Sequence, residues 1–233
     1  MIGDVINRLK RELPATVKLV AVSKFHPFEA IQEAYEAGQR AFGESRPQEL
    51  LAKVKRLEDV RIERGEPDYM SDLEWHFIGH LQTNKLKMVL PYVSLVQSVD
   101  SVRLLEAIDR WGAANDKVIN ILLECHVAAE ESKQGFSEEE LIALLSSDVH
   151  YAHVRICGIM GMATFTDDEE VVRADFQRLL DRQQILHDWI GESPNVASGC
   201  NDLSMGMSDD YPIAIEMGST IIRIGSMIFG ERR

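Results

Sequence analysis

The sequence contains few cysteines, and none of them form a close pair. Of its 233 residues only three are cysteine, namely Cys125, Cys157 and Cys200. An odd number of widely separated cysteines does not build a disulfide framework, and it is typical of proteins in reducing compartments. We therefore expect a cytoplasmic protein without disulfides.

The chain also lacks long apolar runs and an excess of positive charge. No apolar run is long enough to span a bilayer, and Met1–Leu13 has no signal-peptide core. Lys and Arg number 25 against 38 Asp and Glu, so the formal net charge is −13. Because cationic side chains supply most nucleic-acid affinity, this charge argues against nucleic acid and anionic membranes as partners. A small anionic ligand stays compatible, since backbone N–H groups can bind phosphate whatever the net charge.

A glycine-rich nucleotide motif is missing as well, because neither G-x-G-x-x-G nor a P-loop follows the first β-like run. Short β-branched runs instead alternate with helix-like stretches. The eight runs that we expect to be strands are Lys18–Lys24, Ala41–Glu44, Glu74–Gly79, Ser94–Val99, Ile119–Val127, Val154–Met160, Val196–Gly199 and Ile221–Ile224. This alternation predicts a single α/β domain over residues 1–233 that folds as a (β/α)8 TIM barrel.

Helix-like stretches lie between these runs, and several begin at Pro, Ser, Asn or Asp as capping residues. They are Pro27–Ala37, Pro47–Leu57, Asn84–Leu90, Ser101–Trp111, Ser137–Leu145, Asp167–Trp189 and Asp209–Met217. The least regular segment, Arg56–Asp72, combines a charge run with Gly65 and Pro67. We expect it to be a long surface loop.

Lys24 ends the first predicted strand in phase with Val20 and Val22, so its side chain should point into the barrel. In this fold the functional residues lie at the C-terminal ends of the strands. A site poor in water favours the neutral amine, which is the nucleophile that imine formation requires. Lys24 is therefore the candidate Schiff-base lysine. A lysine that extends into solvent from the strand end is the alternative.

The last predicted strand contains Arg223, an unusual residue for a core, and a buried guanidinium needs an acceptor. Gly225 and Ser226 follow it, and Asn201–Ser208 offers further hydroxyls beside a glycine. Barrels of this kind usually assemble phosphate sites from the loops after strands seven and eight. We expect a phosphate there, with a plain strand-to-helix turn at Gly225 as the alternative.

Five ordered segments resemble the YggS/PROSC family of pyridoxal-phosphate homeostasis proteins. These segments are Leu19–Lys24, Phe42–Glu44, Trp75–Gln82, Leu203–Ser208 and Ile224–Gly230. The resemblance runs from about Val17 to Gly230, and only the terminal residues and Arg56–Asp72 fall outside it. It implies a barrel like the N-terminal domain of alanine racemase, with pyridoxal 5'-phosphate as cofactor.

The resemblance also implies roles for individual residues. Lys24 would carry the cofactor as a Schiff base, and Arg223 would face the pyridine nitrogen. The residues expected to bind the cofactor are Lys24, His80, Ser204, Met207, Ser208, Arg223, Gly225 and Ser226. Of these, Ser204, Gly225 and Ser226 match phosphate contacts of the family. Ser45 and Arg46 depart from a Gly-Glu-Asn pattern that is frequent in the family, which leaves one ring contact unassigned.

The expected chemistry is weak. A protonated arginine opposite the pyridine nitrogen leaves the ring a poorer electron sink. Racemisation needs proton transfer on both faces of a substrate, whereas Lys24 serves one face, and no motif assigns the second base to a tyrosine. We expect a carrier of pyridoxal phosphate that acts in its homeostasis without efficient catalysis. An amino-acid racemase and a cofactor-independent Schiff-base aldolase are the alternatives.

Apo-enzymes that need the cofactor are the expected protein partners. We expect a monomer, with a homodimer as the alternative. A metal site is not expected, because His76 and His80 would lie roughly 13 Å apart along an extended strand. His80 is interpreted instead as a polar residue at the rim of the barrel.

Overall fold

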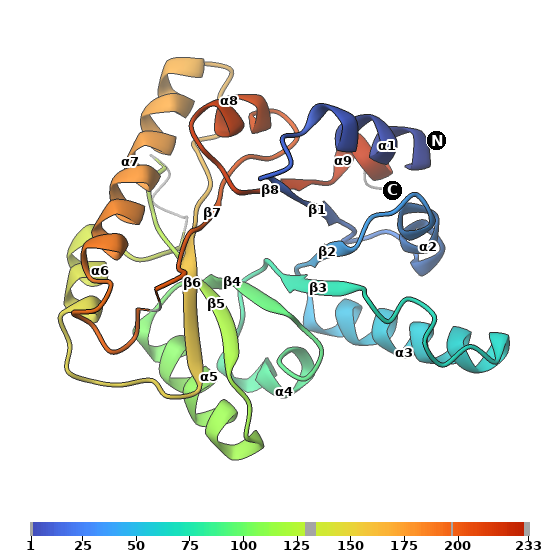
Figure 1. Cartoon of the computed structure of the whole chain (residues 1–233), viewed down its shortest axis with the longest axis horizontal. Coiled ribbons are helices and arrows are strands. Elements are labelled where there is room, and N and C mark those ends of the chain that lie inside the picture. The colour runs from blue at the N-terminus through green and yellow to red at the C-terminus, as the bar shows by residue number, and fades with distance from the viewer. Residues whose placement is uncertain (1, 129–133, 197, 231–233) are drawn as a thin grey trace.

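The structure is a computed structural model that describes residues 2–128, 134–196 and 198–230. Eight parallel strands follow one another in sequence order around a closed barrel, which confirms the predicted fold class (Figure 1). The strands are β1 (Lys18–Val22), β2 (Ala41–Glu44), β3 (Glu74–Phe77), β4 (Leu95–Val99), β5 (Ile119–Glu124), β6 (Val154–Met160), β7 (Asp202–Ser204) and β8 (Ile221–Ile224). Parallel pairing of β1 with β8 closes the barrel.

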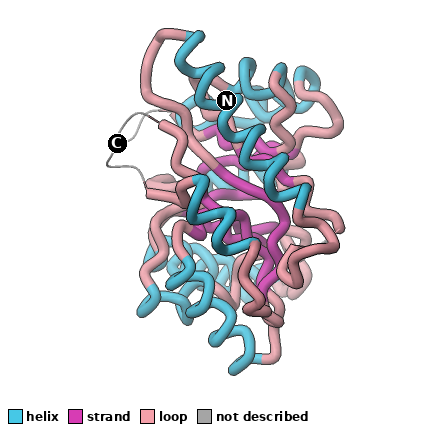
Figure 2. The backbone as a smooth tube through the Cα atoms, turned by 90° about the vertical axis from the view of Figure 1, so that its left-hand side faces the viewer, coloured by secondary structure: helices cyan, strands magenta, loops and turns pink. Residues whose placement is uncertain are grey.

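Helices cover the outside of the barrel, and Figure 2 shows the strands enclosed between them. The helices are α1 (Ile2–Glu12), α2 (Phe28–Glu36), α3 (Pro47–Arg64), the 3-10 helix η1 (Thr83–Lys85), α4 (Leu86–Val89), α5 (Val102–Asn115), α6 (Glu138–Leu145), α7 (Glu169–Asp188), α8 (Tyr211–Glu216) and α9 (Ser226–Phe229). Ser101 caps α5 as predicted, whereas Asp168 rather than the predicted Asp167 caps α7; both side-chain oxygens accept backbone N–H groups. Ser137 forms a capping box with Glu140 at the start of α6.

The two faces of β1 pack into different cores. Leu19 and Ala21 belong to the large cluster between barrel and helices. Val20 belongs to a smaller cluster inside the barrel, which comprises Val20, Ala41, Leu95, Leu122, Met160 and Ile221. Both faces are therefore buried, as the apolar alternation in this strand predicts.

The seventh strand was predicted at the wrong place. It is Asp202–Ser204 and not Val196–Gly199. Val196 makes only an isolated bridge with Ile156, and residue 197 lies outside the described residues. The pattern failed because the true strand is short and partly polar and is held by pairing with β6 rather than by β-branched residues.

The expected loop at Arg56–Asp72 is also wrong over its first half, because α3 continues to Arg64. Its charged residues occupy the solvent-facing side of this helix, while Leu57 and Val60 are buried one turn apart on the other side. The helix ends at Gly65, whose φ of 66° is left-handed. Only the segment after Gly65 is a connection.

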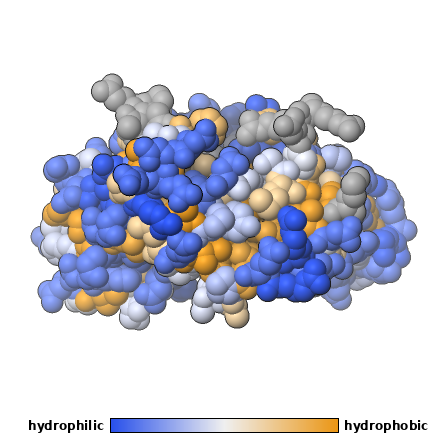
Figure 3. Space-filling model, turned by 90° about the horizontal axis from the view of Figure 1, so that it is seen from above, coloured by the Kyte–Doolittle hydropathy of each residue, from blue (hydrophilic) through white to orange (hydrophobic). Residues whose placement is uncertain are grey.

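The outer surface mixes polar and apolar side chains. Seen from above, polar residues dominate, and apolar residues gather towards the middle of that face (Figure 3). Within the ranges that the structure describes, no helix combines the length and the apolar character needed to cross a bilayer.

The close approach of β6 and β7 at Gly158 generates the first prediction. A Cβ on Gly158 would lie 1.8 Å from the Asp202 carbonyl oxygen, so Gly158→Ala should push the strands apart and destabilise the protein by about 3 kcal/mol. Gly65→Ala is the control, because Gly65 also has a positive φ but faces open space; it should cost about 1 kcal/mol. Urea unfolding followed by circular dichroism measures both, and equal losses would contradict the strand-contact explanation.

Candidate functional site

A cavity of about 260 Å³ opens where the barrel strands end, at the mouth predicted to carry function. It is lined by Val22, Lys24, His26, Ile78, Met160, Met162, Phe165, Met207, Ser208, Asp209, Arg223, Gly225, Ser226 and Gly230. Six of the eight expected cofactor residues therefore surround one space, namely Lys24, Met207, Ser208, Arg223, Gly225 and Ser226. Met160, Met162 and Met207 give part of this lining an apolar character.

A buried polar network holds the backbone just before Lys24. The Ser23 hydroxyl donates to Glu44 Oε1 at 2.5 Å. Lys53 Nζ donates to the same carboxylate oxygen at 2.6 Å and to the Ser23 carbonyl oxygen at 2.8 Å. Burial raises the pKa of Glu44, and the charge of Lys53 partly offsets this effect. The end of β1 is thus tied to β2 and α3.

The residue after Lys24 is held too. Phe25 has a left-handed φ of 69°, and its backbone N–H donates to Glu49. Glu49 also accepts from Lys53 at 3.0 Å, so one ammonium group organises the contacts on both sides of Lys24. A lysine whose neighbouring backbone is fixed in this way presents its amine from a defined position.

Arg223 enters the cavity from β8 and is only 5% exposed. One guanidinium nitrogen donates to the Ser204 carbonyl oxygen at 2.9 Å and to the Ser204 hydroxyl at 2.5 Å, and the other donates to the Gly161 carbonyl oxygen at 2.9 Å. Burial lowers the pKa of Arg223 to about 10, so the group stays cationic at neutral pH. The acceptor that a buried arginine requires is present.

Ser204, which is expected to bind the phosphate, does not line the cavity, and its contact with the cofactor stays a prediction. Ser204 is the last residue of β7 and is fully buried, and its hydroxyl donates to Gln97 Oε1 at 2.7 Å while it accepts from Arg223. Because the seventh strand was predicted too early, Ser204 was assigned to a loop, whereas it lies at the end of β7. Ser204 supports Arg223 there.

His80 also lies outside the cavity. Its side chain is 51% exposed, and its Nδ1 lies 3.0 Å from Asp100 Oδ2. The chain turns at Gly79, where any Cβ would lie 2.2 Å from the Ser45 carbonyl oxygen. Ile78 therefore supplies the cavity contact from this segment. His80 lies at the exposed position expected for the rim and does not line the cavity, and its contact with the cofactor stays a prediction.

Hydroxyls from the two expected loops meet at the cavity. The Ser226 hydroxyl lies 3.1 Å from the Ser208 hydroxyl, so the segments after β7 and β8 come together there. Gly225 approaches β1 closely, because a Cβ on it would lie 3.3 Å from the Val22 carbonyl oxygen. Two hydroxyls beside the start of α9 suit an anion with several acceptor oxygens.

The sequence reasoning missed His26 and Phe165. His26 lines the cavity and stacks on Phe229 with ring centroids 5.1 Å apart. Burial and the charge of Lys53 lower the pKa of His26. Its place two residues after Lys24 was a usable signal, whereas Phe165 follows β6 in a loop without a motif. Neither Ser45 nor Arg46 lines the cavity.

Glu124 ends β5 as a buried carboxyl group whose charge interacts with that of Arg223. Burial raises the pKa of Glu124 to about 7; the charge of Asp100 adds to this rise, and Arg223 opposes it.

No cluster of His, Cys, Asp and Glu in the described part of the chain could hold a metal ion. The donor set is thus an amine, a guanidinium and hydroxyls, which suits an aldehyde that bears a phosphate.

Comparison with known proteins gives a consistent result. The model of the alanine racemase N-terminal domain family matches residues 3–233. A pyridoxal phosphate homeostasis protein of Aquifex aeolicus is 39% identical over 216 residues, which are 93% of this chain and 87% of that protein.

Solved structures agree with this match. PipY of Synechococcus elongatus without pyridoxal phosphate is similar with a TM-score of 0.86 and 34% identity, over 99% of this chain and all of that one. The same protein with pyridoxal phosphate bound gives a TM-score of 0.83 at 33% identity over the same share of this chain. An alanine racemase of Corynebacterium glutamicum, at 16% identity and a TM-score of 0.69, shares the fold over 99% of this chain and 60% of its own.

The raised pKa of Glu124 predicts a pH dependence of stability. A carboxyl group with a folded pKa of about 7 and an ordinary value of 4.5 contributes stability below the ordinary value and loses it as the pH rises through 7. Wild type should therefore lose on the order of 3 kcal/mol relative to Glu124→Gln between about pH 4.5 and about pH 8. Urea midpoints measured across this range test it, with the exposed Glu58→Gln as control. Parallel curves for wild type and Glu124→Gln would refute the effect.

Proposed function

The chain belongs to the family of pyridoxal phosphate homeostasis proteins, which shares the alanine racemase N-terminal domain, and on this premise we propose that it carries pyridoxal 5'-phosphate on Lys24. The observation that supports this proposal most is the convergence of Lys24, Arg223 and the Ser208–Ser226 hydroxyl pair on one cavity. An amine, a fixed cation and paired hydroxyls match the aldehyde, ring and phosphate of this cofactor. The residues present therefore fit the group.

The attachment is a condensation. The ε-amine of Lys24 would hold the cofactor by condensing with its aldehyde, with loss of one water. Ser23, Glu44 and Lys53 hold the backbone that presents this amine. Ser208, Gly225 and Ser226 would bind the phosphate, and Met207 would pack beside them.

Carriage without efficient catalysis follows from Arg223. Its guanidinium remains cationic and is fixed by carbonyl and hydroxyl acceptors, so it disfavours a proton on a pyridine nitrogen that faces it. Bound pyridoxal phosphate supplies electron-withdrawing chemistry to its enzymes, and this arginine weakens that property. The relatives are named homeostasis proteins rather than enzymes.

The racemase alternative has less support. Racemisation needs a second acid or base on the face opposite the lysine. Within the described ranges no tyrosine lines the cavity. The aldolase alternative lacks support from the relatives.

Delivery to apo-enzymes, a monomeric state and a cytoplasmic location are further parts of this proposal. Phe165 and Met207 are exposed at the rim of the cavity, at 88% and 37%, where a receiving protein would approach. All three cysteines are free thiols, which suits a reducing compartment. A single barrel forms the whole cavity, so the site needs no second copy.

The attachment site is tested by spectroscopy. Wild type incubated with pyridoxal phosphate should show an imine absorption band, and borohydride reduction followed by peptide mapping should find the adduct on Lys24. Lys24→Ala should lose both, whereas the exposed Lys55→Ala should retain both. An adduct at another lysine, or no band in wild type, would refute the proposal. Rapid turnover of an amino acid by wild type would favour the racemase.

The phosphate contacts are tested by comparing the binding of pyridoxal phosphate with that of pyridoxal. Ser226→Ala should weaken pyridoxal phosphate binding about tenfold, because it removes a hydrogen bond to a charged acceptor. Binding of pyridoxal, which lacks the phosphate, should not change. Equilibrium titration measures both affinities, with the exposed Ser71→Ala as control. An equal loss for both ligands would show that Ser226 does not contact the phosphate.

A further inference from the structure

A second and larger cavity lies at the opposite mouth of the barrel, where the strands begin. It encloses about 680 Å³ and is lined by Ala15, Thr16, Val17, Lys18, Glu74, His76, Ser94, Leu95, Asn120, Cys157, Asp202, Thr220 and Ile221. Its volume is within the range of small-molecule sites, and polar groups from β1, β3, β5 and β7 converge on it. The cofactor proposal assigns no role to it.

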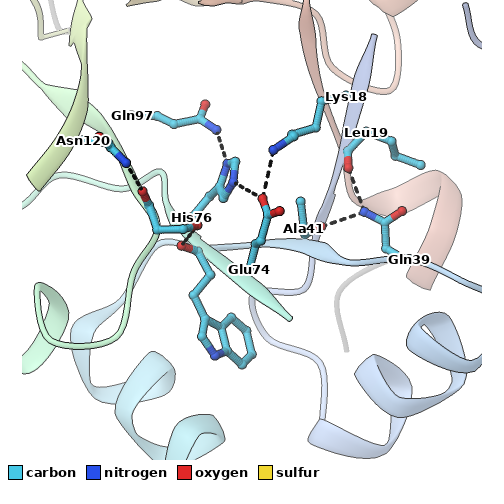
Figure 4. A network of polar contacts seen from close by, with 10 residues as sticks. Lys18, Leu19, Gln39, Ala41, Glu74, His76, Gln97 and Asn120 are labelled. Carbon is cyan, nitrogen blue, oxygen red and sulfur yellow. Dashed lines mark hydrogen bonds and ion pairs between the residues drawn. The ribbon is translucent and has the colours of Figure 1, made fainter. Parts of the chain in front are cut away.

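Part of its wall is a chain of polar contacts (Figure 4). Lys18 Nζ donates to Glu74 Oε2 at 2.9 Å, and His76 Nε2 lies 3.6 Å from the same oxygen. His76 Nδ1 lies 2.8 Å from Gln97 Nε2. The contacts to His76 and Lys18 lower the pKa of Glu74 to about 2, so Glu74 is a carboxylate.

This series of polar contacts continues through the barrel to the opposite mouth, where we propose that the cofactor binds. Gln97 Oε1 accepts from the Ser204 hydroxyl at 2.7 Å, and that hydroxyl accepts from Arg223 at 2.5 Å. Because the carbonyl of Gln97 faces Ser204, its N–H2 group faces His76, whose Nδ1 is therefore an acceptor. The proton of neutral His76 then lies on Nε2, towards Glu74. Each side chain in this series of polar contacts is therefore oriented by the next one.

The charges in the second cavity do not balance. Lys18 and Glu74 neutralise each other by direct contact. Burial lowers the pKa of His76, which keeps the ring neutral. The Asp202 side chain makes no hydrogen bond or ion pair with any other residue that the structure describes. Burial raises the pKa of Asp202, and the charges of Lys18 and His76 partly oppose this rise. One carboxylate is left over, so a monocation would complete the cavity.

We propose that this cavity is a second ligand site, which binds a small organic ammonium ion through Asp202. An N–H of the ligand would donate to the Asp202 carboxylate, and Asn120 and Thr220 lie on the same wall for its polar substituents. A metal ion fits less well, because the space is far larger than an ion and the described residues include no group of His, Cys, Asp and Glu that could hold one.

The series of polar contacts allows a ligand in this cavity to change the electrostatic field at the cofactor. A cation beside Asp202 shifts the electrostatic field at Glu74 and His76, and the oriented chain passes this change to Arg223. The second step rests on the proposed function, because it needs a cofactor in contact with Arg223. Binding of the ammonium ion at Asp202 does not depend on the proposed function.

Trimethylammonium is the probe, because it carries one N–H and cannot condense with an aldehyde. Calorimetric titration of the cofactor-free protein should detect binding of trimethylammonium and not of neutral tert-butanol. Asp202→Asn should weaken it about tenfold or more, as expected for loss of a charge-assisted hydrogen bond. Lys24→Ala and the exposed Glu106→Gln should bind like wild type. Absence of binding, or equal binding by Asp202→Asn, overturns the site.

The coupling between the two sites is measured from the absorption band of the bound cofactor. In the loaded wild type, saturating trimethylammonium should shift the imine band, and Gln97→Leu should bind the probe without this shift. Ser204→Ala is the second variant, in case Gln97→Leu unfolds. If the probe binds and the band does not move, the route to Arg223 is wrong and the site stands. Failure of wild type to form an imine band would overturn the proposed function and leave the titration of the cofactor-free protein unaffected.

Discussion

The buried guanidinium of Arg223 is the interaction on which the rest of the site depends. A charge inside a barrel is tolerated only when its donors are satisfied, and here β7 and the segment after β6 supply the acceptors at Ser204 and Gly161. That requirement brings β6, β7 and β8 into a fixed relation. It also makes the interior of the barrel polar between its apolar layers, since Ser204 in turn bonds to Gln97.

Lys24 depends on a different arrangement. Its neighbours are held by Glu44, Glu49 and Lys53, which form a buried ion cluster between β2 and α3. Such a cluster adds little net stability, because desolvation costs about as much as attraction returns. Its effect is geometric, because it fixes the backbone on both sides of the amine that we propose holds the cofactor. The site thus combines a fixed cation on β8 with a fixed amine after β1.

The sequence predicted this convergence better than it predicted individual contacts. Lys24 was found because it follows the first apolar run in phase with Val20 and Val22, although β1 itself ends at Val22. Arg223 was found because an arginine is unusual inside a strand. Gly225, Ser226, Met207 and Ser208 followed from the preference of barrels for phosphate loops after the last two strands. Ser204 and His80 do not line the cavity, because their places depend on where β7 begins and where the chain turns at Gly79, and neither has a local pattern. Their contacts with the cofactor stay predictions.

The sequence by itself determined the barrel, the order of its strands and the mouth that carries Lys24, because apolar periodicity and chirality restrict an alternating chain to few topologies. The extent of α3 and the place of β7 were decided by tertiary packing, which overrides charge runs and weak strand propensity. Only the folded barrel placed Gln97 between His76 and Ser204 and left Asp202 in a second cavity. These residues are distant in sequence, and only closure of the barrel brings them together.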